Sequence, residues 1–244
     1  KICKEFKIDV LVPGVDEELT LLPMIRQKLV ALKIICPQDS FITNMLDKKI
    51  MSETLKNIGV ETPIIRDQHS VIDGNSYVMK PRVGRGSRGV VKINSQEQIG
   101  AYLKLYQKKA DEIIVQDEIF GTEYTIIVSC NDKGNLIDIM PLRVNSKKGI
   151  TLIALTDYSN NVVKVCEKIC AMLKPIGVFN VQLIVDKINN PFVIEINPRI
   201  STTTCLGFFA GCDVIDNFIN GKDRVRNKQR LQLKLTRTWH NQLR

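Results

Sequence analysis

The chain has 244 residues, of which 44% are hydrophobic and 25% charged, a composition typical of a globular protein with a sizeable core. No apolar run approaches the roughly 20 residues that cross a bilayer, so we expect no membrane partner. The net charge of +9 is scattered except between Lys222 and Arg237, a stretch that we interpret as solvated surface rather than a nucleic-acid site.

The cysteines and histidines narrow the possible chemistry. The seven cysteines include no CxxC pair and no metal-binding spacing, so we expect buried thiols in a reducing, cytoplasmic environment. Only His69 and His240 are present, which argues against any mechanism that needs a pair of histidines.

The first elements in chain order predict the end of an open α/β domain. Residues 8–14 (IDVLVPG) form a short apolar run closed by Pro-Gly, residues 16–29 have helical spacing, and residues 32–37 resemble a strand again. Because the chain starts abruptly in strand-like sequence, we expect a fragment of a longer protein.

The next segments predict two helices, a hairpin and a third helix. Residues 40–63 predict a helix capped by Ser40 and a second helix stopped by Gly59. Strands follow at 76–81 and 89–93, and residues 95–110 predict an amphipathic helix with Ser95 as its N-cap.

The second half of the chain is predicted to be rich in strands. Strands are expected at 112–119 and 123–130 on either side of Gly121, at 136–144, and in a hairpin formed by 179–186 and 191–198. A long helix is expected at 160–177. This order of elements predicts an α+β fold with antiparallel hairpins.

The stretch KPRVGRGSRGVVKI, residues 80–93, has glycine spacing that fits three kinds of phosphate-binding loop. A dinucleotide fingerprint leads into a helix, whereas Val90, Val91 and Ile93 favour a strand, so the glycines form the tip of a hairpin. A protein kinase also needs HRD and DFG motifs, which the sequence lacks, and Lys80 precedes the glycines. A third nucleotide-binding fold remains.

The stretch VIEINPR, residues 193–199, supplies candidate metal ligands. Glu195 and Asn197 lie two residues apart on a strand and therefore share a face. Oxygen donors of this kind suit Mg²⁺, and Gln182 on the neighbouring hairpin strand would add a third. Arg199 would point into the same space.

Several motifs occur in an order that resembles the ATP-grasp enzymes, most closely their carbamoyl-phosphate-synthase-like branch. They are LDKK, IGVETP, VMKPRVGRGSRG, IVQDEIFGTEY, FNVQLIVD and VIEINPR, with LTRTW similar to the closing segment. The resemblance implies an ATP-grasp fold in which two antiparallel-sheet lobes clamp ATP. It also implies three parts, namely the end of a pre-ATP-grasp α/β domain (1–39), a lobe with a glycine-rich lid (40–115) and a lobe with the metal site (116–244).

The resemblance also implies a role for each matching residue. Lys48 and Lys80 would contact the ATP phosphates beneath a lid formed by Gly84, Gly86, Ser87 and Gly89. Gln116 would lie near the adenine amine, Asp117 and Ile119 would use backbone groups, and Glu123 would hold the ribose. Gln182, Glu195 and Asn197 would bind Mg²⁺, with Mn²⁺ as the alternative, while Arg199 and Lys80 would be catalytic.

We therefore expect a ligase that activates a carboxylate as an acylphosphate for attack by an amine, with a homodimer as one option for its assembly. The alternative is a nucleotide-binding subunit or fragment without independent ligase activity. Some residues also have a simpler interpretation. Glu123 is equally a solvated charge, Gln182 could lie on either strand face, and one of Lys48 and Lys49 is expected to be solvated. Residues 143–156 are shorter than the family pattern, which leaves the substrate pocket least defined.

Overall fold

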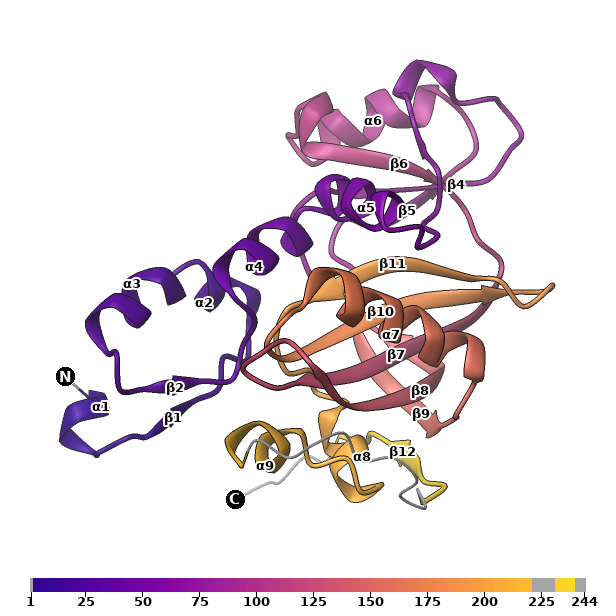
Figure 1. Ribbon diagram of the computed structural model, residues 1–244. Coiled ribbons are helices and arrows are strands. Elements are labelled where there is room, and N and C mark those ends of the chain that lie inside the picture. The colour runs from indigo at the N-terminus through magenta and orange to yellow at the C-terminus, as the bar shows by residue number, and fades with distance from the viewer. Residues whose placement is uncertain (1, 221–230, 240–244) are drawn as a thin grey trace, which may run out of the picture.

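The computed structural model describes residues 2–220 and 231–239, which form an N-terminal segment and two antiparallel sheets stacked one above the other (Figure 1). The helices are α1 (Ile2–Glu5), α2 (Asp16–Leu19), α3 (Leu22–Lys28), α4 (Asp39–Leu46), α5 (Lys48–Asn57), α6 (Glu97–Leu105), α7 (Asn160–Leu173), α8 (Thr204–Phe209) and α9 (Val214–Ile219). The strands are β1 (Val10–Leu11), β2 (Lys33–Ile34), β3 (Ile65–Arg66), β4 (Tyr77–Pro81), β5 (Val91–Ile93), β6 (Ile113–Asp117), β7 (Gly121–Cys130), β8 (Leu136–Lys148), β9 (Ile150–Thr156), β10 (Gly177–Asp186), β11 (Pro191–Asn197) and β12 (Lys234–Thr236).

The N-terminal segment pairs β1 with β2 in parallel and connects them through two helices. The helical spacing of 16–29 is divided into α2 and α3 because Pro23, at the start of α3, cannot continue a preceding helix. Leu19, Leu22 and Ile34 are buried in a small core of this segment. The strand–helix–strand order agrees with the expectation, and its origin in a pre-ATP-grasp domain stays a prediction.

The smaller sheet has the strand order β3-β6-β4-β5 and packs against α6. Its core includes Tyr77, Met79, Ile93 and Ile99. β4 and β5 pair antiparallel, so residues 82–90 connect them as a hairpin, as predicted. The predicted cap Ser95 is wrong, because α6 begins after Gln96, whose backbone amide donates to Asp73 at 3.1 Å.

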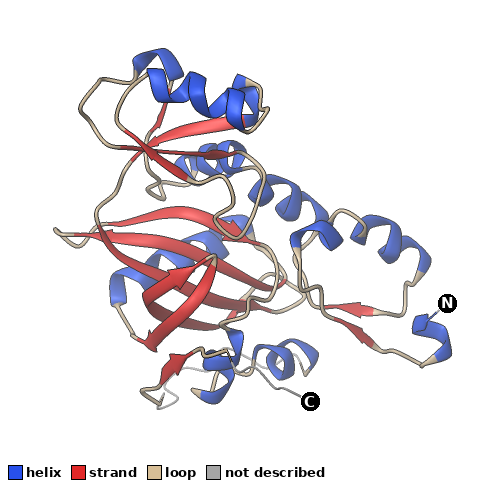
Figure 2. Ribbon diagram, turned by 180° about the vertical axis from the view of Figure 1, so that it is seen from behind, coloured by secondary structure: helices blue, strands red, loops and turns tan. Residues whose placement is uncertain are grey.

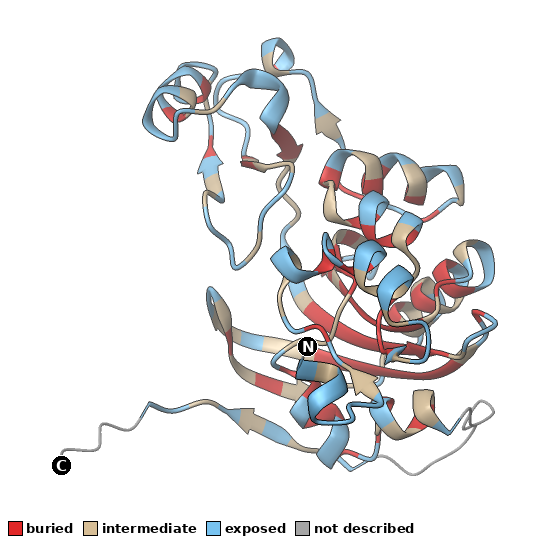
Figure 3. Ribbon diagram, turned by 90° about the vertical axis from the view of Figure 1, so that its left-hand side faces the viewer, coloured by how far each residue is buried: buried red, intermediate tan, exposed pale blue. Residues whose placement is uncertain are grey.

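The larger sheet has the order β11-β10-β7-β8-β9-β12 and is covered by helices on both faces (Figures 1 and 2). Side chains alternate along β7, so that Ile126 and Val128 join the core under α7 while Ile127 joins the core under α8 and α9. The helix α7 ends earlier than predicted because Lys174 adopts a left-handed conformation, with φ of 47°. Buried positions are concentrated on these sheet strands and on the helix faces turned toward them (Figure 3).

The helices α4 and α5 connect the N-terminal segment to the smaller sheet but pack on the larger one. Phe41 and Met45 of α4 and Met51 and Leu55 of α5 share the core that contains α7. Ser40 is not the cap of α4, because the helix begins at Asp39 after an extended Gln38 and Asp39 pairs with Arg26. The expected boundary at 115/116 falls inside β6, and the division of the chain at 39/40 and 115/116 stays a prediction.

The remaining expectations concern composition. Five of the seven cysteines are buried, as predicted, whereas Cys3 is partly exposed and Cys205 is exposed. Most of the basic stretch 222–237 lies outside the described residues, but Lys234 lies on β12, which pairs with β9. Within 2–220 and 231–239 no helix combines the length and the apolarity required to traverse a membrane.

Candidate active site

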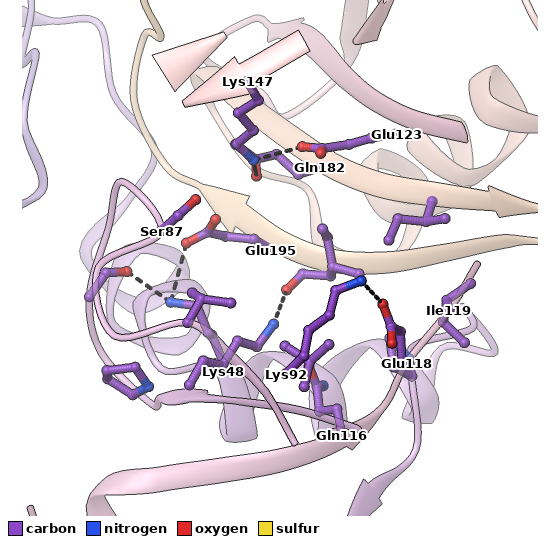
Figure 4. Close-up of a pocket in the computed structure, with 18 of the residues that line it drawn as sticks. Lys48, Ser87, Lys92, Gln116, Glu118, Ile119, Glu123, Lys147, Gln182 and Glu195 are labelled. Carbon is purple, nitrogen blue, oxygen red and sulfur yellow. Dashed lines mark hydrogen bonds and ion pairs between the residues drawn. The ribbon is translucent and has the colours of Figure 1, made fainter. Parts of the chain in front are cut away.

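A cavity of about 360 Å³ lies between the two sheets, beneath the glycine hairpin (Figure 4). Ten of the fourteen predicted site residues line it, namely Lys48, Lys80, Gly84, Ser87, Gln116, Asp117, Ile119, Glu123, Gln182 and Glu195. Three more, Gly86, Asn197 and Arg199, line an adjoining second cavity of about 210 Å³. Gly89 lines neither cavity and has a structural position that is described below.

The floor of both cavities is the sheet face opposite α7. In the register of β7 and β10, Gln182 pairs with Thr125 and Ile184 pairs with Glu123. Because these residues alternate with buried core positions, all four project from the same face, and the structure answers which face Gln182 occupies. Along this face of β7 the side chains change from apolar to polar. Ile127 belongs to the core, whereas Thr125 and Glu123 line the two cavities.

A bulge in β11 determines how the strand that carries Glu195 and Asn197 faces the cavity. Gln182 pairs with Glu195 and Leu183 with Val193, which leaves Ile194 as the extra residue of the bulge. Val193 and Ile196 both enter the core, so Ile194 and Glu195 both face the cavity. The bulge therefore directs two consecutive side chains into the site, where regular alternation would direct one.

The two predicted phosphate-binding lysines are buried and come from different elements, Lys48 from α5 and Lys80 from β4 of the smaller sheet. Lys80, on β4, is 7% exposed and donates to the carbonyl of Ile194 at 3.1 Å. Burial lowers the pKa of Lys80 to about 8, although the nearby Glu195 opposes the change. An ammonium at the base of this cavity is costly unless an anion joins it, which is the property expected of a phosphate-binding group.

Lys48 joins three parts of the site. It is the first residue of α5, directly after the N-cap Asp47, and its Nζ lies 3.2 Å from Glu195 Oε1. The same ammonium donates to the carbonyl of Gly84 in the lid at 2.8 Å. Lys49 is exposed, so Lys48 is the member of the pair that belongs to the site.

The lid depends on glycine at positions with positive φ. Gly86 has φ of 65° and Gly89 has φ of 69°, conformations that side chains with a Cβ rarely adopt. At Gly89 a Cβ would also meet Tyr102 Oη at 2.9 Å, and that hydroxyl donates to the Gly89 carbonyl at 2.7 Å. Gly89 therefore anchors the base of the lid on α6 and does not contact the cavity.

The far end of the larger cavity combines apolar walls with an unpaired amide. Val78 on β4, Ile184 on β10 and Ile194 on β11 line it from both sheets. Gln116 is 2% exposed, and its NH₂ group has no hydrogen-bond partner among the described residues. A flat base with polar edges would fit between these walls and pair with that amide.

The carboxylates of Asp117 and Glu118 are held by neighbouring side chains. The carboxylate of Asp117 accepts two hydrogen bonds from Arg66, at 2.7 and 2.6 Å, which leaves only its backbone for the cavity. Burial alone would raise the pKa of Glu118, but Lys92 and Ser76 outweigh it and hold that pKa below its ordinary value. Ile119 lies beside Glu118 at the edge of the cavity (Figure 4).

Glu123 is not a free surface charge. Lys147, from the end of β8, donates to Glu123 at 2.7 Å and to Gln182 at 3.4 Å. These contacts place a third lysine between the expected ribose and metal ligands (Figure 4). The hairpin β8–β9 therefore reaches the site, although residues 143–156 are shorter than the family pattern.

The expected metal ligands fit a hard divalent ion that uses few protein groups. Gln182 and Glu195 are cross-strand partners, and Glu195 and Asn197 both line the second cavity. All three offer oxygen donors, as Mg²⁺ requires. Within the described chain no three His, Cys, Asp or Glu residues cluster as a metal site.

Several lining residues were not found from the sequence, namely Lys92, Glu118, Val78, Ile184, Ile194, Arg85 and Arg88. Two of them follow from strand periodicity, because Val78 precedes Lys80 by two residues and Ile184 follows Gln182 by two. Ile194 gave no such signal, since only the bulge turns it toward the cavity.

The sequence of the chain matches a known domain family. A sequence model of the ATP-grasp domain family matches residues 45–203, more than half of the chain. The carbamoyl phosphate synthase large chain of Methanosarcina mazei is 23% identical over 186 residues, which cover 68% of this chain and 17% of that protein.

Solved structures show the same fold. The biotin carboxylase domain of the 2-oxoglutarate carboxylase from Hydrogenobacter thermophilus, in complex with MgADP, ADP and bicarbonate, has a TM-score of 0.76 at 17% identity and covers 93% of this chain and 57% of that one. The carboxyaminoimidazole ribonucleotide synthase from Aspergillus clavatus, complexed with ATP, has a TM-score of 0.63 at 16% identity and covers 80% of this chain and 55% of that one. The predicted two-sheet fold is thus confirmed, and the chain belongs to the ATP-grasp domain family.

Proposed function

We propose that the chain binds Mg·ATP in the larger cavity and uses it to activate a carboxylate for attack by an amine. The observation that carries this proposal is the convergence of two buried lysines, Lys48 and Lys80, with Glu195 beneath a glycine lid. The adenine would lie between Val78 and Ile184, near the unpaired amide of Gln116, with the ribose toward Glu123. The phosphates would extend toward Lys80.

The second cavity would hold the carboxylate. It adjoins the first through Ser87, Lys147, Gln182 and Glu195 and contains the guanidinium of Arg199. Its other lining is rich in hydroxyl groups, from Thr125, Thr151, Ser201, Thr202 and Thr203. At about 210 Å³ it favours a small polar acid, so bicarbonate and short amino acids are the first candidates.

The reaction would proceed in two displacements. A carboxylate oxygen attacks the γ-phosphorus, the bond to the bridging oxygen breaks, and ADP leaves with that electron pair. The amine nitrogen then attacks the acyl carbon and phosphate departs, while the nitrogen loses a proton. Lys80 and Arg199 would hold the phosphoryl oxygens, and the lid would exclude water.

Gln182, Glu195 and Asn197 would hold Mg²⁺, with Mn²⁺ as the alternative ion. When bound there, the ion would neutralise charge on the phosphate oxygens. Because Glu195 supplies the only formal charge of the three, the site should need nucleotide phosphates for its completion.

A thermal-shift titration tests nucleotide binding, and a phosphate-release screen tests the reaction. Mg·ATP should raise the melting temperature by mass action, and Lys80→Ala should remove most of that shift while the protein stays folded. Pairs of small acids and amines should then release ADP and phosphate in equal amounts. An unchanged nucleotide response in Lys80→Ala would show that the phosphate site lies elsewhere.

A nucleotide-binding part without independent ligase activity is the second candidate. The observation in its favour is that the chain spans 17% of the curated relative and 57% of the first structure compared. A thermal shift with ATP but no ADP release from any pair would select this candidate.

Light scattering tests the expected homodimer, an arrangement named for the Hydrogenobacter domain.

A further inference from the structure

The N-terminal segment contributes two carboxylates to the neighbourhood of the site. Asp16 and Glu17 are the first residues of α2, and the preceding Gly14 and Val15 line the second cavity. The carboxylate of Glu18 accepts from the backbone amide of Gly14 at 3.0 Å, which folds this turn back on itself. We call residues 14–18 the acidic turn.

Asp16 contacts the proposed catalytic arginine. Arg199 Nε donates to Asp16, and both side chains are nearly buried, at 13% and 15% exposure respectively. Arg199 Nη1 donates to the carbonyl of Ile200 at 3.1 Å, so Nη2 is the one guanidinium nitrogen without a partner among the described residues. Since Arg199 lines the second cavity, these two contacts fix which edge of the guanidinium is available there.

Glu17 contacts the lid. Arg85 Nε donates to Glu17 Oε1 at 2.9 Å, and this pair is more exposed, at 33% and 64%. The pKa of Glu17 lies below its ordinary value because of a hydrogen bond to its own backbone and because of Arg85. Exposed pairs are weak, which suits a contact that must release each time a lid opens, whereas the nearly buried Asp16–Arg199 pair suits a permanent support.

We propose that the acidic turn is a functional part of the site, in which Asp16 is the positioning residue for Arg199 and Glu17 is the docking point of the lid. This inference rests on the proposed function, in which the lid and Arg199 both take part in the activation of the carboxylate by ATP. Residues of the N-terminal segment would then set the rate of a reaction whose substrates lie between the other two parts of the chain.

A charge exchange tests the docking point without requiring a substrate pair. Trypsin cleavage after Arg88, an exposed lid residue, is followed with and without Mg²⁺ and the non-hydrolysable analogue AMP-PNP. Glu17→Arg and Arg85→Glu should each speed cleavage about 2- to 5-fold, as expected for loss of an exposed pair. The double variant should return to the wild-type rate, and Glu97→Arg, which changes an exposed carboxylate outside the turn, should have no effect.

Kinetics test the positioning role with the acid and amine found by the screen. Asp16→Asn should lower kcat at least about 10-fold and leave the KM for ATP nearly unchanged, because a misplaced arginine affects the reacting group and not nucleotide binding. Asp16→Glu, which keeps the charge if Asn impairs folding, should recover part of the rate.

The two arms separate the possible failures. The acidic turn has no such role if trypsin cleaves the double variant Glu17→Arg/Arg85→Glu as fast as the single variants. The same conclusion follows if Asp16→Asn keeps the kcat of the wild type. If AMP-PNP fails to protect even the wild-type lid, nucleotide binding itself is wrong, whereas the charge exchange in its absence still decides whether Glu17 holds the lid.

Discussion

Burial of Lys80 should make the free energy of unfolding depend on pH, and replacing Lys80 with methionine should remove this dependence. Its pKa falls from the ordinary 10.5 to about 8 in the folded protein. Between these values the unfolded chain binds a proton that the folded chain does not, so the free energy of unfolding rises with pH across this range. A difference of about 2.5 pKa units corresponds to about 3 kcal/mol.

The change is Lys80→Met, which keeps the unbranched shape and most of the length of the side chain but removes the ammonium. Relative to the wild type, the variant should be most stable below pH 8 and should lose about 3 kcal/mol of that relative stability by pH 10.5. Urea unfolding followed by circular dichroism at pH 7, 8, 9 and 10 gives the difference at each pH, in which the titration of all other groups cancels.

Lys49→Met is the matched control, because Lys49 is exposed and lies beside the site lysine Lys48. Its difference from the wild type should stay flat over the same range. A Lys80→Met difference that changes by less than about 1 kcal/mol would refute the reasoning, since it would mean that the Lys80 ammonium stays hydrated in solution.

Three further changes test the proposed metal strand, the larger sheet and α6. Glu195→Gln should lower ADP formation roughly 100-fold and weaken its dependence on Mg²⁺ concentration, since in the proposed mechanism the lost charge acts on the phosphoryl group; normal turnover would remove Glu195 from the proposed metal site. Gly121→Ala should destabilise the protein by at least about 2 kcal/mol in urea unfolding, because a Cβ there would lie 1.9 Å from the Val185 carbonyl oxygen. Gly100→Ala, in α6 with no atom within 4 Å of its Cβ, should be neutral or stabilising by up to about 1 kcal/mol, and equal effects at the two glycines would contradict the packing described.

The features that the sequence predicted well are local. The glycine hairpin follows from β-branched residues directly after Gly89, and the β10–β11 hairpin follows from two alternating runs around a short polar turn. The choice between Lys48 and Lys49 was also within reach, because Asp47 accepts from the amides of Lys49 and Ile50 as a helix cap. That cap fixes the helical phase in which Lys48 turns inward.

The features that the sequence did not predict depend on distant partners. The bulge at Ile194 exists only in the register of β11 with β10, and no spacing within β11 reveals it. The contact between Asp16 and Arg199 joins residues 183 positions apart. Its acidic residues look like an ordinary first helical turn, in which carboxylates are favoured in any case.

The connection between the two sheets has a consequence for motion. β6 of the smaller sheet continues into β7 of the larger sheet through residues 118–120, beside the second connection, residues 58–64 between α5 and β3, and Gln116 and Ile119 lie at that crossing. In a rigid rotation, displacement grows with distance from the axis, so an axis through this crossing would leave the proposed base site almost still and would move the glycine hairpin, at the far end of β4, much farther. The affinity for a nucleoside should then be nearly the same whether the two sheets are open or closed. Only the affinity for the triphosphate should depend on closure.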